Sequence, residues 1–214
     1  LSRLNHKKIF VTGIFANTMR EKYLKENSIV VKNESDTFFY NLEKSGSLNL
    51  NFLNELFIKK DLINEFYSPV SLDDFPYPDW GSYTKKFPLR NDFFSLKQKI
   101  AVPLLGTRGC PYSCFFYCTY PLQQGRKVRA RSVENIIDEI KFWKKELGTN
   151  KFVFRDPVFS INRKHTIEFC NEVINQKLNI SFMVETHLNN LDDEMIPLLR
   201  KAGLELLYVG VESS

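Results

Sequence analysis

The sequence predicts an α/β protein whose parallel strands form a partial (βα) barrel, truncated after its fourth strand and preceded by the tail of another α/β domain. From residue 101 onward, short apolar segments alternate with segments of helical periodicity, joined by short connections. Polar residues resume where each apolar segment ends, and reactive groups of parallel α/β folds collect there. Residues 1–70 carry a weaker strand–helix alternation.

In the N-terminal region we expect strands at 8–12 and 28–31, with a polar helix at 17–26 between them. A further helix starts at Ser35 or Asp36 and stops before Gly46. Residues 50–67 fit either a helix or a hairpin, and we favour the hairpin.

Residues 71–100 form the predicted linker between the two domains, 1–70 and 101–214. The stretch is rich in proline, which fixes φ and pushes the preceding residue toward extended conformations. Tyr77 and Trp80 are interleaved with the prolines. We therefore expect an extended segment whose aromatic side chains lie against a surface.

The C-terminal region supplies four strands, at 101–105, 151–154, 181–185 and 205–211. Helices separate them, and their caps are readable from the sequence. The first begins at Ser132 and stops at Gly148, the second begins at Ser160 or Asn162, and the third runs from Asp192 to Gly203. Right-handed βαβ units and a parallel sheet follow from this order.

Composition excludes several classes of protein. The 214 residues are 43% hydrophobic and 26% charged, which is ordinary globular usage. No apolar run is long enough for a membrane helix, and no secretory signal opens the chain. A net charge of +5 is too small an excess to argue for nucleic acid. Because the chain begins with Leu and stops just after an apolar segment, we expect a piece of a longer protein.

Three of the four cysteines, Cys110, Cys114 and Cys118, lie within one loop, GTRGCPYSCFFYCTYP. Thiolate sulfur suits iron–sulfur clusters or zinc. Three local thiolates can hold three irons of a [4Fe–4S] cluster and leave the fourth iron open. Zinc normally takes four ligands, so it would need Cys170 or a distant His. Cys170 repeats with the apolar face of its helix, which predicts a core position.

The cysteine loop, together with the later segments FRDPVF and AGLELLYVGVES, resembles the radical S-adenosylmethionine (radical SAM) superfamily. The linker phrase LDDFPYPDW is similar to the segment that follows a cobalamin-binding domain in one branch of that superfamily. One departure is the C-x3-C-x3-C spacing, since the superfamily commonly has C-x3-C-x2-C. A second is the absence of Gly-Gly-Glu after the second strand, where FRDPVF stands instead.

The resemblance implies that the three loop cysteines ligate a [4Fe–4S] cluster, which reductively cleaves S-adenosylmethionine to a 5′-deoxyadenosyl radical. The branch adds cobalamin for methyl transfer or rearrangement at an unactivated carbon. It further implies a small-molecule substrate, an electron donor such as a flavodoxin or ferredoxin, and a cytoplasmic location. The cosubstrate contacts carried over by the resemblance fall on Tyr117, Asp156, Glu185, Glu212 and Ser213.

Two alternatives stay open. A tRNA methylthiotransferase would need further cluster cysteines in its N-terminal domain, and residues 1–100 contain none. A zinc-stabilised nucleic-acid-binding module would use the same three cysteines together with the basic segment QQGRKVRARS. That segment could meet a phosphate or an acidic substrate, although a solvated basic loop is the simpler interpretation of its four cationic residues.

Overall fold

The computed structural model describes residues 8–23, 27–32, 34–46, 49–59, 64, 66–67, 69–86, 101–114 and 117–210. The chain separates into two units. The first comprises residues 1–75 and 109–127, and the second comprises residues 76–108 and 128–214. The division therefore falls close to the predicted linker, but the cysteine loop is grouped with the first unit.

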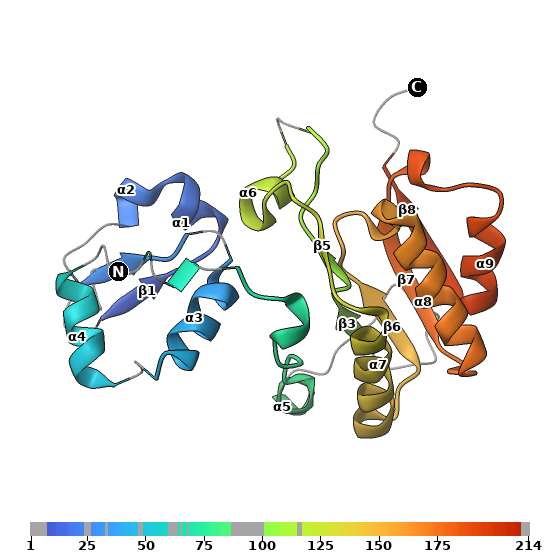
Figure 1. Ribbon diagram of the computed structural model, residues 1–214, viewed down its shortest axis with the longest axis horizontal. Helices are drawn as coiled ribbons and strands as arrows, with labels where there is room; N and C mark the ends of the chain where they lie inside the picture. The colour runs from blue at the N-terminus through green and yellow to red at the C-terminus, as the bar shows by residue number, and fades with distance from the viewer. Residues whose placement is uncertain are drawn as a thin grey trace. The chain divides into compact units, whose positions relative to one another are not determined.

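The first unit contains two short parallel strands, β1 (Ile9–Val11) and β2 (Ser28–Val30), with Phe10 opposite Ile29. Two short helices follow β1, and two longer ones follow β2: α1 (Ile14–Thr18), α2 (Arg20–Tyr23), α3 (Ser35–Lys44) and α4 (Leu50–Ile58). The first pair lies on one side of the strands and the second pair on the other (Figure 1). The predicted strand–helix alternation is thus present, with the single expected helix at 17–26 replaced by α1 and α2.

The hairpin favoured for residues 50–67 is wrong, because residues 50–58 form α4. The Asn49 side chain caps this helix by accepting a hydrogen bond from Phe52 N at 2.9 Å. Leu56 and Phe57 are buried with Phe38 and Leu42 of α3. Helical spacing brings those apolar side chains to one face, so tertiary packing settles what the sequence pattern left open.

The linker is only partly extended. It contains a 3₁₀ turn at Leu72–Asp74 and a helix, α5 (Trp80–Lys86), which is capped by Asp79 Oδ1 accepting from Ser82 N at 2.9 Å. Tyr77 and Trp80 pack against the core of the second unit, as expected for aromatics that lie on a surface. Residues 87–100 lie outside the described part of the chain.

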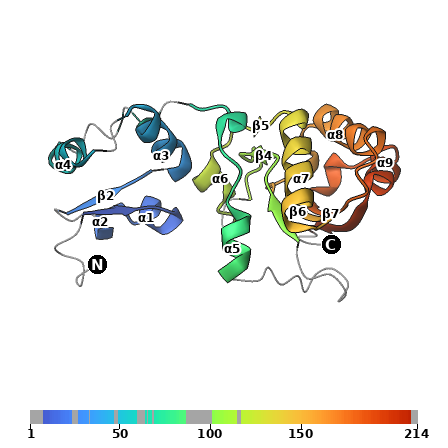
Figure 2. The ribbon, with the colours of Figure 1, turned by 90° about the horizontal axis from the view of Figure 1, so that it is seen from below.

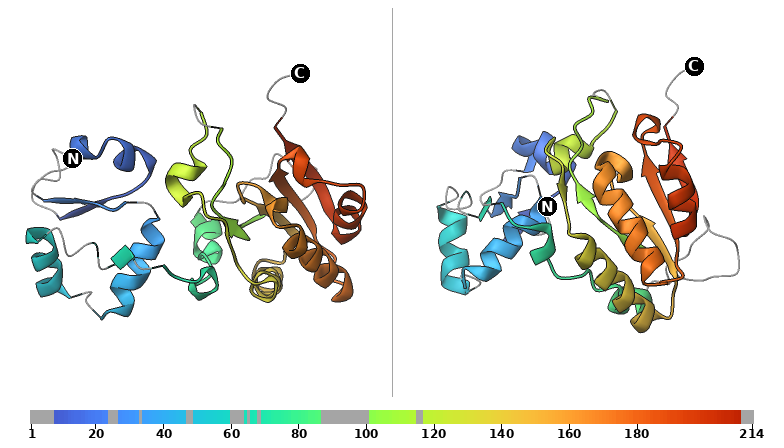
Figure 3. Two further views of the ribbon diagram at one scale, coloured as in Figure 1. Left: turned by 45° about the horizontal axis from the view of Figure 1, so that its top comes forward. Right: turned by 45° about the vertical axis from the view of Figure 1, so that its right-hand side comes forward.

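The second unit is built on a four-stranded sheet in the order β3-β6-β7-β8, parallel throughout. Its strands are β3 (Val102–Leu104), β6 (Lys151–Phe154), β7 (Ser181–Thr186) and β8 (Leu204–Val209). The connecting helices are α7 (Val133–Leu147), α8 (Arg163–Asn175) and α9 (Met195–Ala202). These helices cover one face of the sheet (Figure 2), and α8 lies between α7 and α9 (Figure 3). The predicted α/β fold with parallel strands is confirmed.

Helix caps follow the predicted chemistry. Ser132 accepts from Asn135 N and Asn162 accepts from His165 N, both at 3.2 Å. Gly148 ends α7 with a left-handed φ of 61°. Asp192 accepts from Met195 N at 2.7 Å, although the residue directly before α9 is Glu194.

The sheet's two faces are distinguished by strand alternation. Phe152 and Phe154 of β6 face the helices and belong to the large core. Val153, between them, clusters with Ala101, Met183 and Leu206 on the opposite face. By the same alternation, Arg155 and Glu185 fall on this second face, whereas Asp156 turns toward the helix side.

A short strand pair and a short helix lie next to the cysteine loop in the sequence. The strands β4 (Thr107–Arg108) and β5 (Arg129–Ala130) pair antiparallel, and a short helix, α6 (Tyr120–Gln124), lies between them in the sequence.

In the described part of the chain, no helix combines the length and apolar character that crossing a bilayer requires.

Candidate metal and cofactor site

The base of the cysteine loop is closed by two hydrogen bonds. Cys110 N donates to Gly125 O at 3.1 Å, and Gly109 N donates to the Gln124 side-chain oxygen, also at 3.1 Å. Within the loop, Cys118 N donates to Cys114 O at 3.1 Å. The chain between Cys110 and Cys118 is therefore fastened at both ends, as a loop that presents several thiols needs to be.

Arg126 fastens the segment between the first two cysteines. One of its terminal nitrogens lies 3.4 Å from Pro111 O, 3.2 Å from Tyr112 O and 3.3 Å from Ser113 Oγ. The residue is exposed, so these contacts are made at the surface. Arg126 of the predicted basic loop thus holds part of the cysteine loop in place.

All three loop thiols are free, with Cys110 buried and Cys114 and Cys118 half-buried. Burial raises the pKa of the Cys110 thiol, while a hydrogen bond from the Tyr112 backbone lowers it. The neighbouring Cys118 and Cys114 thiols raise this pKa as well. Among the residues described, no three Cys, His, Asp or Glu side chains converge tightly enough to enclose a metal ion.

The donor set nevertheless fits an iron–sulfur cluster. A cluster is a large group held by thiolates, and thiolate sulfur is the ligand that it prefers. Cys170, the fourth cysteine, is fully buried in the core of the second unit, and burial raises its pKa to about 12. A thiol held protonated in this way is a small apolar core residue rather than a ligand, as the sequence pattern predicted.

Asp156, which follows β6, is only 1% exposed. Its Oδ1 accepts from Gly106 N at 2.8 Å, and its Oδ2 accepts from the Thr107 hydroxyl at 2.7 Å. A Cβ at Gly106 would lie 3.1 Å from Asp156 Oδ2 and 3.3 Å from Ile136 Cδ1, so the close approach depends on glycine. Both carboxylate oxygens are thus engaged inside the fold.

The buried position shifts the titration of this carboxyl group. Burial raises the pKa of Asp156 to about 6, against the opposing effects of the hydrogen bonds from Gly106 and Thr107 and of the Arg131 charge. The group is therefore ionised at neutral pH but takes up a proton well above the ordinary range of an aspartate.

We expect the free energy of unfolding to report this shift. Because the folded pKa is raised above the unfolded value of 3.8, the contribution of Asp156 is fully present below pH 3.8 and is lost as pH rises through about 6. Relative to Asp156→Asn, the wild type should lose about 3 kcal/mol over that window. Chemical denaturation at pH 4, 5, 6 and 7 measures the difference, and a difference that instead grows in favour of the wild type with pH contradicts the expectation.

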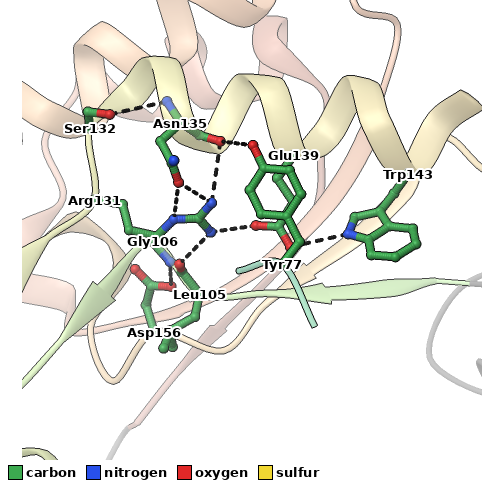
Figure 4. Close-up of polar contacts among 9 residues, drawn as sticks. All are labelled: Tyr77, Leu105, Gly106, Arg131, Ser132, Asn135, Glu139, Trp143 and Asp156. Atoms are coloured by element: carbon green, nitrogen blue, oxygen red, sulfur yellow. Dashed lines mark hydrogen bonds and ion pairs between the residues drawn. The ribbon is translucent and has the colours of Figure 1, made fainter. Parts of the chain in front are cut away.

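Arg131 is the residue that sequence reasoning missed. The sequence groups Arg131 with a basic loop, but its side chain is largely buried, at 11% exposed. Its guanidinium donates to the Asn135 side-chain oxygen at 2.7 Å, to Leu105 O at 3.2 Å and to the carboxylate of Glu139, which is 1% exposed (Figure 4). The interpretation of this segment as wholly solvated is therefore wrong at Arg131.

Two aromatic side chains complete the surroundings of this ion pair. Trp143 Nε1 donates to Glu139 at 3.2 Å, and the ring of Tyr77 lies 5.8 Å from the Arg131 guanidinium carbon (Figure 4). The Tyr77 hydroxyl also reaches Asn135 O at 3.5 Å. A signal for this cluster is present in the sequence, because Glu139 falls on the apolar stripe of α7, where a carboxylate requires a partner.

Within the second unit, strand alternation places Glu185 on the opposite face of the sheet from Asp156. Glu185 accepts from Arg155 at 3.3 Å on the sheet face opposite α7, α8 and α9, and both side chains are partly exposed, at 36% and 53%. Tyr208 of β8 lies opposite Glu185 in the strand pairing. Tyr117 is 51% exposed on the cysteine loop. Glu212 and Ser213 lie outside the described residues.

A buried pair of hydroxyl groups lies at the C-terminal ends of β6 and β7. Ser160, in the loop that follows β6, and Thr186, the last residue of β7, are both buried and joined by their hydroxyl groups. Ser160 N also donates to Thr186 Oγ1 at 3.3 Å. This pair fastens the loop after β6 to β7 and has no hydrogen bond to residues 105–108 among the contacts described.

Comparison with known proteins identifies the family. Residues 104–214 match the sequence model described as the radical SAM superfamily. Anaerobic magnesium-protoporphyrin IX monomethyl ester cyclase of Cereibacter sphaeroides is 29% identical over 218 residues, which cover 94% of this chain and 34% of the relative. Bacteriochlorophyllide d C-12(1)-methyltransferase of Chlorobaculum tepidum is 32% identical over 115 residues, which cover 52% of this chain and 25% of the relative.

Among solved structures, the chain is similar to OxsB, a cobalamin-dependent S-adenosylmethionine radical enzyme with aqua-cobalamin and S-adenosylmethionine bound. The TM-score is 0.58 at 15% identity, over 96% of this chain and 31% of that one, which shows a shared fold. The chain spans about a quarter to a third of the length of the relatives that it matches. With the family match covering half of its residues, the chain belongs to the radical SAM superfamily.

Proposed function

We propose that this chain is part of an enzyme that cleaves S-adenosylmethionine reductively at a [4Fe–4S] cluster and acts on a small molecule. In this proposal, residues 101–214 are the first half of the catalytic core, residues 71–100 are a linker, and residues 1–70 are the end of a cobalamin-binding-like domain. The observation that carries it is the set of three free thiols, Cys110, Cys114 and Cys118, on one fastened loop of a radical SAM chain.

The chain's own residues divide the work. The three thiolates hold the cluster, Arg126 and the hydrogen bonds at the loop base hold the thiolates, and the apolar core of the second unit supports the strand ends. When bound, the cluster would supply the electron for reductive cleavage of S-adenosylmethionine to methionine and a 5′-deoxyadenosyl radical. We assign cosubstrate contacts to Tyr117, Glu185, Glu212 and Ser213.

Relatives named as methyltransferases and cyclases support methyl transfer or a cyclisation at an unactivated carbon as the reaction class. Cobalamin, bound in the similar structure of OxsB, is the second cofactor of this proposal. The electron comes from a reduced carrier such as a flavodoxin or ferredoxin, and the location is cytoplasmic. The relatives are named as methyltransferases and cyclases, which favours these reactions over a methylthiotransferase.

Cosubstrate cleavage tests the proposal directly. The full-length protein, reconstituted anaerobically with iron and sulfide and reduced with dithionite, is expected to form 5′-deoxyadenosine from S-adenosylmethionine without any added substrate. Glu185→Gln should keep the iron content but bind the cosubstrate about tenfold more weakly, the loss expected for one charge-assisted hydrogen bond. A colourless protein that binds stoichiometric zinc and forms no product would contradict the proposal and favour the zinc-stabilised module.

A further inference from the structure

The connection between β3 and β4, Leu105 and Gly106, is held through three of its backbone groups. Asp156 binds Gly106 N at 2.8 Å, the Arg131 guanidinium binds Leu105 O at 3.2 Å, and Arg131 N binds Gly106 O at 2.9 Å (Figure 4). Thr107, the first residue of β4, is fixed as well, because its hydroxyl donates to Asp156. Two side chains from different elements thus converge on one turn of the chain.

This arrangement is a costly way to stabilise a fold. Asp156 and Glu139 are each 1% exposed, and the side chain of Arg131 is 11% exposed. Moving charges out of water costs several kcal/mol per ion, and well-packed apolar residues of similar volume often stabilise a protein as well or better. Buried polar contacts instead fix geometry, because hydrogen bonds set the orientation of the groups that they join.

These contacts fix the turn at Leu105 and Gly106, from which the chain continues in sequence into the cysteine loop. Cys110 follows Thr107 by three residues. Gly106 permits the approach of Asp156, since a side chain there would meet the carboxylate oxygen at 3.1 Å. The turn is therefore fixed in position immediately before the first thiol of the loop.

We propose that Asp156 is a positioning residue for the iron–sulfur cluster: by holding Gly106 and Thr107 it orients the chain that delivers Cys110. The inference rests on the proposed function, in that it needs the three thiols to bind a cluster. It gives Asp156 a different role from the cosubstrate contact expected from the resemblance, because both carboxylate oxygens are already engaged within the fold. Outer partners that orient metal ligands typically change metal affinity by about 10–100-fold when they are removed.

The test compares Asp156→Ala and Asp156→Asn with a matched control in the full-length protein. The control is Thr186→Val, which removes a buried hydroxyl pair at the end of the neighbouring strand and leaves residues 105–107 alone. Three quantities are measured for each: the thermal midpoint, the rate of iron loss to a chelator after anaerobic reconstitution, and the electron paramagnetic resonance spectrum of the reduced cluster.

Asp156→Ala is expected to release iron about tenfold faster than the wild type and to change the spectrum. Asp156→Asn should restore most of both properties, because its amide can accept from Gly106 N and donate to the Thr107 oxygen. Thr186→Val should lower the thermal midpoint while keeping the wild-type spectrum and an iron-loss rate within about twofold of the wild type.

Equal effects of Asp156→Ala and Thr186→Val on the cluster, at equal loss of stability, would overturn the proposal and leave Asp156 a general stabiliser of the fold. Should Asp156→Ala not fold, Thr107→Val removes one of the two contacts alone, and a wild-type spectrum and iron-loss rate in that variant would equally overturn it. A wild-type protein that takes up no iron contradicts the proposed function itself, which is a separate result.

Discussion

Replacing Cys110, Cys114 or Cys118 singly with alanine is expected to remove the cluster, with bound iron falling from about four atoms per chain to less than about one after anaerobic reconstitution. Alanine offers no ligand in place of the thiolate, and the other free cysteine is held protonated in the core, away from this role. Under the proposed function, cosubstrate cleavage should be lost with the iron, since the cluster would supply the electron.

Cys170→Ala is the matched control for these three variants. The Cys170 thiol is fully buried among apolar side chains, so its removal leaves a small cavity and costs about 1 kcal/mol of stability without changing iron content. Colorimetric iron analysis on the four variants separates the two kinds of cysteine. A full cluster in Cys118→Ala together with an empty Cys170→Ala would contradict the assignment across the C-x3-C-x3-C spacing.

Gly203→Ala is expected to destabilise the second unit by about 3–5 kcal/mol or to prevent folding. Gly203 ends α9 with φ of 111°, and a Cβ there would lie 2.0 Å from the backbone oxygen of Ile180. Neither the strained dihedral nor the collision can be relieved without moving the chain that leads into β7, because the obstacle is backbone rather than a flexible side chain.

Gly148→Ala provides the comparison, since Gly148 also ends a helix in the left-handed region, at φ 61°, but a Cβ there meets nothing within 4 Å. Gly148→Ala should lower the free energy of unfolding only by the strain of the left-handed backbone conformation, about 1–2 kcal/mol. Chemical denaturation of both variants separates conformational strain from steric exclusion. Equal losses of unfolding free energy in the two would refute the argument from the close approach.

Much of the second unit could be predicted because its determinants are local. Ser132 and Gly148 delimit α7 by chemistry that acts within a turn of the residue concerned, and strand–helix alternation fixes a parallel sheet. The cysteine loop was readable for the same reason, as its three thiols lie within nine residues.

What could not be predicted depends on contacts between distant residues. Asp156 meets Gly106 across 50 positions of sequence, and nothing near either residue announces the partner. Arg131 is chemically identical to Arg126 and Arg129 in the sequence, and its burial follows from its partner Glu139, eight residues later on a helix that must first be packed. The hairpin expected at 50–67 failed similarly, because packing against α3 selects the helix.

The two residues that follow β6 divide the sheet's edge between two tasks. Arg155 is half-exposed and pairs with Glu185 on the sheet face opposite α7, α8 and α9, whereas Asp156 is buried and pairs with the turn before β4. Substitutions at these adjacent positions therefore have different consequences: a change at Arg155 removes a surface ion pair, whereas a change at Asp156 removes the buried contacts that hold the turn.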